Sequence, residues 1–114
     1  MWAWASVPVG GDSGETCRIR RDFMGLERRT VHFVGRVQGV GFRYTTKRLA
    51  ADYDVTGFVK NLPDGRVQLV AEGEVKEIDH LVEAVQREMT GNIHATQVDR
   101  KAYQGAFVNF DIAY

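Results

Sequence analysis

Glycine and arginine residues gather in one short stretch of the chain, Gly35-Arg36-Val37-Gln38-Gly39-Val40-Gly41-Phe42-Arg43. Glycines adopt positive φ angles and leave backbone N–H groups uncovered, so successive amides can converge on one anion. If a helix follows, its first turn adds free N–H groups and the positive end of its dipole. A cation such as Arg43 opposes that dipole unless an anion is bound there, and its guanidinium can hold two phosphate oxygens. The stretch therefore predicts a phosphate-binding loop.

The spacing of these glycines excludes two common nucleotide-binding loops. It is not the G-x-G-x-x-G pattern of dinucleotide-binding proteins, and it lacks the G-K-[ST] of ATP-type phosphate-binding loops. Taken alone, the stretch is also compatible with a tight connection in which Arg43 pairs with a surface carboxylate. A phosphate cradle and a purely structural connection both stay open on these residues alone.

Alternation of apolar and polar residues predicts the strands that must position this loop. Val31 and Phe33 share one face of the segment Thr30–Arg36, which predicts a strand that leads into the loop. Four further segments have strand character: Val55–Asn61, Arg66–Gly73, Thr96–Tyr103 and Ala106–Ile112. Leu62-Pro63-Asp64-Gly65 predicts a tight turn between two of them, because proline fixes φ and Asp-Gly suits the corner.

Two other segments carry apolar residues at helical spacing. The first, Phe42–Tyr53, begins directly after the glycines, and the second runs from Val75 to Met89, just before Gly91. The order β-α-β-β-α-β, followed by a short C-terminal strand, predicts an α+β split βαβ sandwich. In that fold both helices lie on one face of an antiparallel sheet.

Composition narrows the class of protein. The 114 residues suit a single domain, and Lys+Arg and Asp+Glu are both 15, so the formal net charge is zero. A zero net charge argues against partners such as nucleic acid or an anionic membrane surface. With one cysteine, Cys17, and no pattern of a signal peptide or membrane helix, we expect a cytoplasmic protein without disulfides. His32, His80 and His94 are too scattered for a metal motif, so we expect no metal site.

The first 28 residues differ from the rest of the chain. They hold Trp2 and Trp4 and a glycine-rich cluster at 10–14, and they show neither strand alternation nor a helical apolar stripe. We expect residues 1–28 to be a poorly ordered extension and residues 29–114 to form the folded domain. Two alternatives remain open: Met24 is the natural start of the protein, or the tryptophan pair docks on the domain.

The Gly35–Arg43 stretch resembles the signature of the acylphosphatase family. A second block, Gly57-Phe58-Val59-Lys60-Asn61 followed by Asp64-Gly65, resembles the other motif of that family, with Asn61 eighteen residues after Arg43. Val98-Asp99-Arg100 and the ending Phe107-Val108-Asn109-Phe110-Asp111-Ile112-Ala113-Tyr114 resemble its late strands. The resemblance covers residues 30–114 and implies the ferredoxin-like βαββαβ sandwich that the periodicity predicts.

The resemblance implies an enzyme that hydrolyses small-molecule acyl phosphates to a carboxylate and inorganic phosphate without metal or cofactor. It gives phosphate binding to Arg43 and to a backbone cradle, and positioning of the attacking water to Asn61. The residues of the cradle are Gln38, Gly39, Val40, Gly41 and Phe42. The chemistry suits these groups, because the conjugate acid of the leaving carboxylate has a pKa of about 4 and needs no strong general acid. We expect the protein to act as a monomer.

Two other functions remain as alternatives. The same fold occurs as the N-terminal domain of the hydrogenase-maturation carbamoyltransferase, so the chain could be a non-catalytic module that binds carbamoyl or acyl phosphate. Because no zinc-finger region follows Tyr114, we expect a stand-alone enzyme. The other alternative is an RNA-recognition module, which shares the βαββαβ order but needs a block of aromatic residues on the sheet and a basic surface. Gly57-Phe58-Val59 resembles such a block only weakly, and the zero net charge argues against a basic surface.

Overall fold

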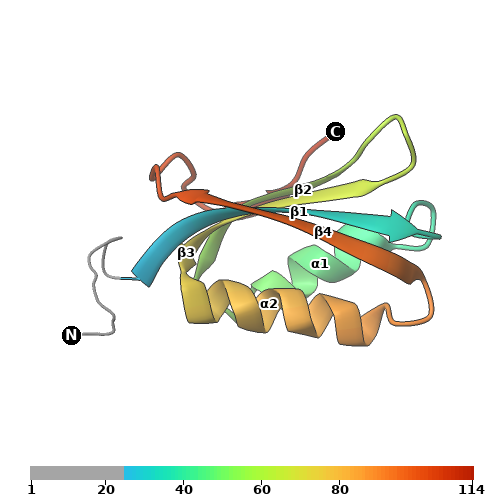
Figure 1. Cartoon of the computed structure of the whole chain (residues 1–114), viewed down its shortest axis with the longest axis horizontal. Coiled ribbons are helices and arrows are strands. Elements are labelled where there is room, and N and C mark those ends of the chain that lie inside the picture. The colour runs from blue at the N-terminus through green and yellow to red at the C-terminus, as the bar shows by residue number, and fades with distance from the viewer. Residues whose placement is uncertain (1–24) are drawn as a thin grey trace.

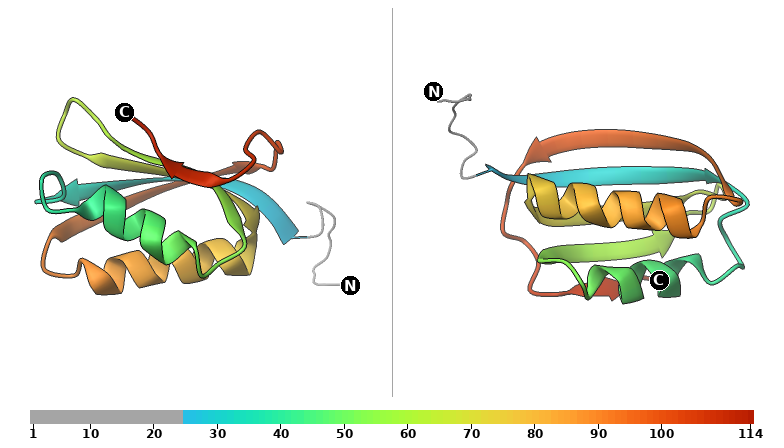
Figure 2. Two further views of the ribbon diagram at one scale, coloured as in Figure 1. Left: turned by 180° about the vertical axis from the view of Figure 1, so that it is seen from behind. Right: turned by 90° about the horizontal axis from the view of Figure 1, so that it is seen from below.

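The computed structural model describes residues 25–114 (Figure 1), so both tryptophans, Cys17, Met24 and most of the predicted extension lie outside the described residues. The elements are β1 (Leu26–Gly35), α1 (Phe42–Ala50), β2 (Val55–Asn61), β3 (Val67–Glu74), α2 (Val75–Glu88), β4 (Ile93–Ala102) and β5 (Phe110–Ile112). The sheet order is β4-β1-β3-β2-β5, and both helices cover the same face of the sheet (Figure 2). The predicted α+β sandwich is confirmed. Neither helix of this part of the chain has the length and apolar character needed to span a bilayer.

Strand β1 begins at Leu26, four residues before the predicted start at Thr30, so residues 26–28 of the predicted extension belong to the sheet. The sequence does not indicate this early start, because charged residues occupy the positions where a strand would normally bury apolar ones. Glu27 and Arg29 are buried, yet each has partners of opposite charge. Arg29 Nε donates to Glu27 Oε2 at 2.7 Å and its Nη1 to Asp79 of α2, while Arg100 of β4 lies 3.0 Å from Glu27. Paired charges can be buried where single ones cannot, so the strand continues through a run that does not look apolar.

The last strand departs from the prediction in length and direction. β5 holds only Phe110–Ile112, shorter than the predicted Ala106–Ile112, and it pairs with β2 in parallel. The other three pairings are antiparallel, so the whole sheet is mixed. Residues 103–109 leave the sheet because they must connect β4 at one edge with β5 at the other (Figure 2). On the face without helices, the Phe107 ring of this connector lies 5.7 Å from the Phe58 ring.

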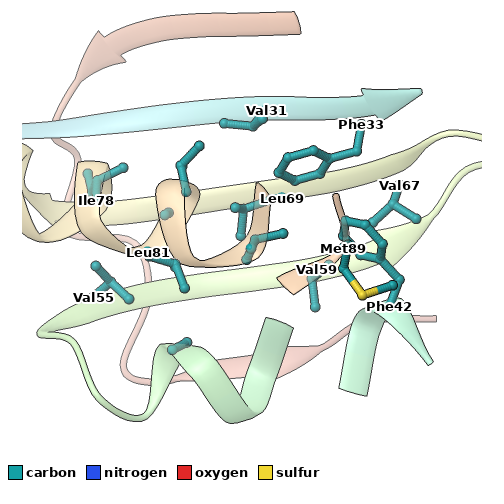
Figure 3. Close-up of a cluster of buried hydrophobic side chains, with 14 of the residues drawn as sticks. Val31, Phe33, Phe42, Val55, Val59, Val67, Leu69, Ile78, Leu81 and Met89 are labelled. Atoms are coloured by element: carbon teal, nitrogen blue, oxygen red, sulfur yellow. The ribbon is translucent and has the colours of Figure 1, made fainter. Parts of the chain in front are cut away.

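The core fills the space between the sheet and the two helices (Figure 3). Alternate residues of the strands and one stripe of each helix enter it, as the predicted periodicity requires. Its fully buried side chains include Val31, Phe33, Val37, Val59, Val67, Leu69, Ile78, Leu81 and Val85. The Phe33 and Phe42 rings lie 5.1 Å apart, which ties the end of β1 to the first residue of α1. The loop between them is therefore held at both ends by the core.

Helix α1 is shorter than predicted. It ends at Ala50 rather than Tyr53, and two turn hydrogen bonds follow, from Asp52 N–H to Leu49 O and from Tyr53 N–H to Ala50 O. Tyr53 still packs against the core, which explains why its spacing looks helical in the sequence.

Candidate active site

The loop between β1 and α1 depends on glycine for its shape. Gly39 and Gly41 have φ angles of 77° and 76°, in the left-handed region that other residues adopt only at a cost. A Cβ at either position would meet no atom of the described residues within 4 Å. Glycine is therefore required by backbone conformation rather than by crowding, and the exposed side of the loop stays open to a ligand.

The N-terminus of α1 carries positive potential that no side chain of the helix compensates. Gly41 is the N-cap and offers no side-chain hydrogen bond, and the first turn contains no acidic residue. The first N–H groups of a helix have no partner within it, and here they lie at the positive end of the dipole. Arg43 adds a cation to the same turn. This arrangement favours an anion at the start of α1.

Gln38 fixes the loop against the β2–β3 turn. Its Nε2 donates to two backbone carbonyls of that turn, Leu62 O at 2.7 Å and Arg66 O at 3.0 Å. The Gln38 side chain is thus engaged in holding the loop, so any contribution of Gln38 to a phosphate cradle would come from its backbone. The same two bonds bring the loop next to the end of β2, where Asn61 lies.

Asn61 reaches the site because of strand alternation. It is the last residue of β2, in which Val55, Gly57 and Val59 face the helices, and a period of two puts Asn61 on that same face. Its position beyond Val59 places it at the rim of the core and next to the first turn of α1. The side chain is half-buried.

A hollow of about 230 Å³ lies where the loop, α1 and β2 meet, and it is smaller than the roughly 300–1,000 Å³ typical of pockets for drug-sized ligands. Its lining consists of Val37, Gly39, Gly41, Phe42, Arg43, Tyr44, Asn61, Ile112 and Tyr114. The structure thus brings together Arg43 and Asn61, the two residues with predicted catalytic roles. Among the predicted cradle residues, Gly39, Gly41 and Phe42 line the hollow, whereas Gln38 and Val40 do not.

The Arg43 guanidinium has an aromatic partner in place of a carboxylate. Within residues 25–114 the ion pairs do not include Arg43, so the alternative of a surface ion pair receives no support there. The guanidinium carbon lies 5.1 Å from the centroid of the Tyr114 ring, within cation–π range. The cation is therefore oriented, and among residues 25–114 its N–H groups have no hydrogen-bond partner that would compete with a ligand.

Four lining residues were not among the predicted site residues: Val37, Tyr44, Ile112 and Tyr114. The last two come to the hollow because β5 runs parallel to β2, with Val59 paired to Ile112 and Ala113 N–H donating to Val59 O. Only knowledge of that pairing could have placed the end of the chain at this site. Tyr44 could have been found from the sequence, because it follows Arg43 in the first turn and is an aromatic residue on the side of the helix where polar residues are expected.

The histidines do not join the site. His32 lies on the face of the sheet without helices, where its Nε2 is 3.3 Å from Gln68 Nε2. Burial, followed by the positive charge of Arg66, lowers the pKa of His32 below its ordinary value. His80 and His94 are exposed elsewhere. Within residues 25–114, no three His, Cys, Asp or Glu side chains are grouped so that they could share a metal ion.

By its fold, the described part of the chain is a ferredoxin-like α+β sandwich with a small polar hollow at the first turn of α1. A family model described as Acylphosphatase matches residues 29–112. An acylphosphatase of Lactobacillus gasseri is 39% identical over 87 residues, which are 75% of this chain and 96% of the relative. The crystal structure of acylphosphatase from Bacillus subtilis is 34% identical with a TM-score of 0.67, over 78% of this chain and 99% of that one. The chain belongs to the acylphosphatase family.

A larger protein contains a similar domain. The crystal structure of full-length HypF in its phosphate- and nucleotide-bound form is 27% identical, with a TM-score of 0.63. The match covers 78% of this chain but only 12% of that one. The similarity therefore concerns one domain of HypF and not the protein as a whole.

Proposed function

We propose that this chain hydrolyses acyl phosphates at the hollow, with Arg43 and the glycine loop binding the phosphoryl group and Asn61 positioning the attacking water. The observation that carries the proposal is the meeting of Arg43, Asn61 and two left-handed glycines in one hollow. Membership of the acylphosphatase family supports the same activity.

The phosphoryl group fits the positive side of the hollow. Backbone N–H groups of the loop and first turn would hold its oxygens, and the planar guanidinium of Arg43 would bind two of them. Charge on these oxygens must be stabilised as the group is transferred, and fixed donors do so without reorganising. Tyr114 beneath the guanidinium limits the directions in which it can point.

Asn61 lines the same hollow as the Arg43 cation. Its amide can accept a hydrogen bond from a water and hold it in line with the phosphorus. The water oxygen forms the new P–O bond as the bond to the acyl oxygen breaks, and the carboxylate leaves with that electron pair. An amide is not a strong base, so the proton of the water passes to a phosphate oxygen.

Inactive phosphate binding is the alternative that the sequence leaves open. It would need the cradle and Arg43 but no residue to hold a water. The presence of Asn61 in the same hollow favours the enzyme.

Expectations of a cytoplasmic monomer that binds no nucleic acid stay predictions. The zero net charge supports the absence of nucleic-acid binding, and size-exclusion chromatography would test the monomer.

Arg43→Ala tests the proposed function. We expect hydrolysis of benzoyl phosphate to fall by roughly 10²–10³-fold or more, as for other removed donors to a transition state, and inhibition by phosphate to weaken. Arg48→Ala is the matched control, because Arg48 is an exposed arginine of the same helix whose nearest carboxylate is 3.7 Å away. Circular dichroism should show both variants folded. Turnover near wild type in Arg43→Ala would overturn the assignment.

A further inference from the structure

An aromatic side chain at the mouth of the hollow has no partner within the described residues. Tyr44 is 71% exposed on the surface of α1. Within residues 25–114 its hydroxyl makes no side-chain hydrogen bond and its ring no ring contact. It nevertheless lines the same hollow as Arg43 and Asn61.

The hollow has two kinds of side wall. One comes from the end of β2 and the C-terminal residues after β5 and holds Asn61 and Tyr114, and the other is the first turn of α1, with Phe42, Arg43 and Tyr44. Phe42 is buried in the core, so the exposed part of the helix wall is Arg43 and Tyr44.

In-line transfer places the leaving oxygen opposite the attacking water. If Asn61 holds the water on the strand side, the acyl group leaves from the far side of the phosphorus. The buried residues Val37 and Phe42 close the floor of the hollow, so the acyl group extends outward along the helix wall. Tyr44 is the exposed aromatic side chain of the helix wall on that path, whereas the Tyr114 ring lies against the Arg43 guanidinium.

We propose that Tyr44 forms the acyl-group subsite and makes the enzyme favour acyl phosphates with a flat, apolar acyl group. This inference rests on the proposed function and deepens it. A planar acyl group can stack on the phenol ring and cover apolar surface that water otherwise contacts. A small aliphatic acyl group, such as acetyl, covers little of that ring. The role of Tyr44 is therefore discrimination among substrates.

Kinetics with two substrates test the proposal. In Tyr44→Ala we expect the ratio of kcat/KM for benzoyl phosphate to that for acetyl phosphate to fall by about five- to tenfold, the size of one aromatic contact. Most of the change should appear in KM for benzoyl phosphate. Tyr44→Phe keeps the ring and should keep the wild-type ratio, because stacking does not need the hydroxyl.

Tyr103→Ala is the matched control, since Tyr103 is an exposed tyrosine that does not line the hollow. It should leave the ratio unchanged. A wild-type ratio in Tyr44→Ala, or an equal loss for both substrates, would overturn the role of Tyr44 while leaving the proposed function intact. If the wild-type protein hydrolysed neither substrate, the proposed function itself would fail, and the subsite with it.

Discussion

Glu72→Gln would test how the connector between the two sheet edges is held in place. The Glu72 side chain is fully buried on β3, on the face without helices. Its Oε2 accepts hydrogen bonds from Arg28 Nε at 3.0 Å and Gln104 N–H at 2.9 Å, and its Oε1 accepts one from Ala106 N–H at 3.0 Å. Gln104 and Ala106 belong to the connector that leads into β5. One carboxylate thus fixes the segment that brings the end of the chain to the hollow.

The structure sets the size of the expected effect. An amide of the same shape keeps one accepting oxygen but places an NH2 group, itself a donor, against at least one N–H donor. The less disruptive orientation puts the NH2 group toward Ala106 and loses one bond together with the negative charge. A lost hydrogen bond to a charged group costs about 1.5–3 kcal/mol, so we expect a loss of about 2 kcal/mol in the free energy of unfolding. For a domain of this size, that lowers Tm by about 8–16 °C.

The effect should also depend on pH. Burial by itself would raise the pKa of Glu72, but the N–H groups of Gln104 and Ala106 together with Arg28 outweigh burial and hold the pKa below its ordinary value of 4.5. A carboxyl whose pKa is lowered in the folded state contributes stability above its unfolded pKa and loses it as pH falls through the folded pKa. The difference between wild type and Glu72→Gln should therefore be full at pH 7 and shrink below about pH 4.5.

Urea unfolding followed by far-UV circular dichroism, at pH 7 and at pH 3, measures both effects. Glu83→Gln is the matched control, because Glu83 is an exposed residue in the middle of α2. It should change stability by less than about 0.5 kcal/mol. A Glu72→Gln protein as stable as this control at pH 7, or a difference that persists at pH 3, would refute the reasoning.

Three shorter predictions concern the site and the sheet. Asn61→Ala should lower kcat far more than it weakens inhibition by phosphate, since its partner is the water, and an equal loss of both in steady-state kinetics would reassign it to phosphate binding. Turnover of benzoyl phosphate should survive excess EDTA, whereas loss on chelation with recovery on adding metal would contradict the mechanism. Gly57→Ala should destabilise the fold by more than about 3 kcal/mol in urea unfolding, because its Cβ would lie 1.8 Å from Val70 O, while Gly91→Ala, in open space, should have little effect.

Much of the fold could be predicted because local patterns agree with the tertiary structure. The alternation of Val31 and Phe33 and the helical spacing from Val75 to Met89 both mark residues that enter the core. The turn at 62–65 also forms as predicted, with Gly65 N–H donating to Leu62 O at 3.1 Å. Where a segment buries apolar residues with a regular period, the sequence carries enough information to identify it.

The prediction fails where burial depends on partners from distant parts of the chain. Glu27 and Arg29 look like surface residues, and only Asp79 and Arg100 allow them to be buried in β1. The connector before β5 looks like a strand, but Glu72 takes its N–H groups away from any ladder. Periodicity does not reveal such contacts, because the residues that make them lie between 32 and 73 positions apart.

For the same reason, only part of the lining of the hollow could be predicted from the sequence. Arg43 and the loop glycines are neighbours in sequence, and Asn61 lies at the end of the next strand, so local order is enough to place them. Ile112 and Tyr114 arrive only through the parallel pairing of β5 with β2, and a slip of one residue would turn both away from the hollow. That register is supported by the ion pair between Lys47 and Asp111 at 3.0 Å. The polar half of the site thus follows from local motifs, whereas the aromatic support of Arg43 depends on how the last strand docks.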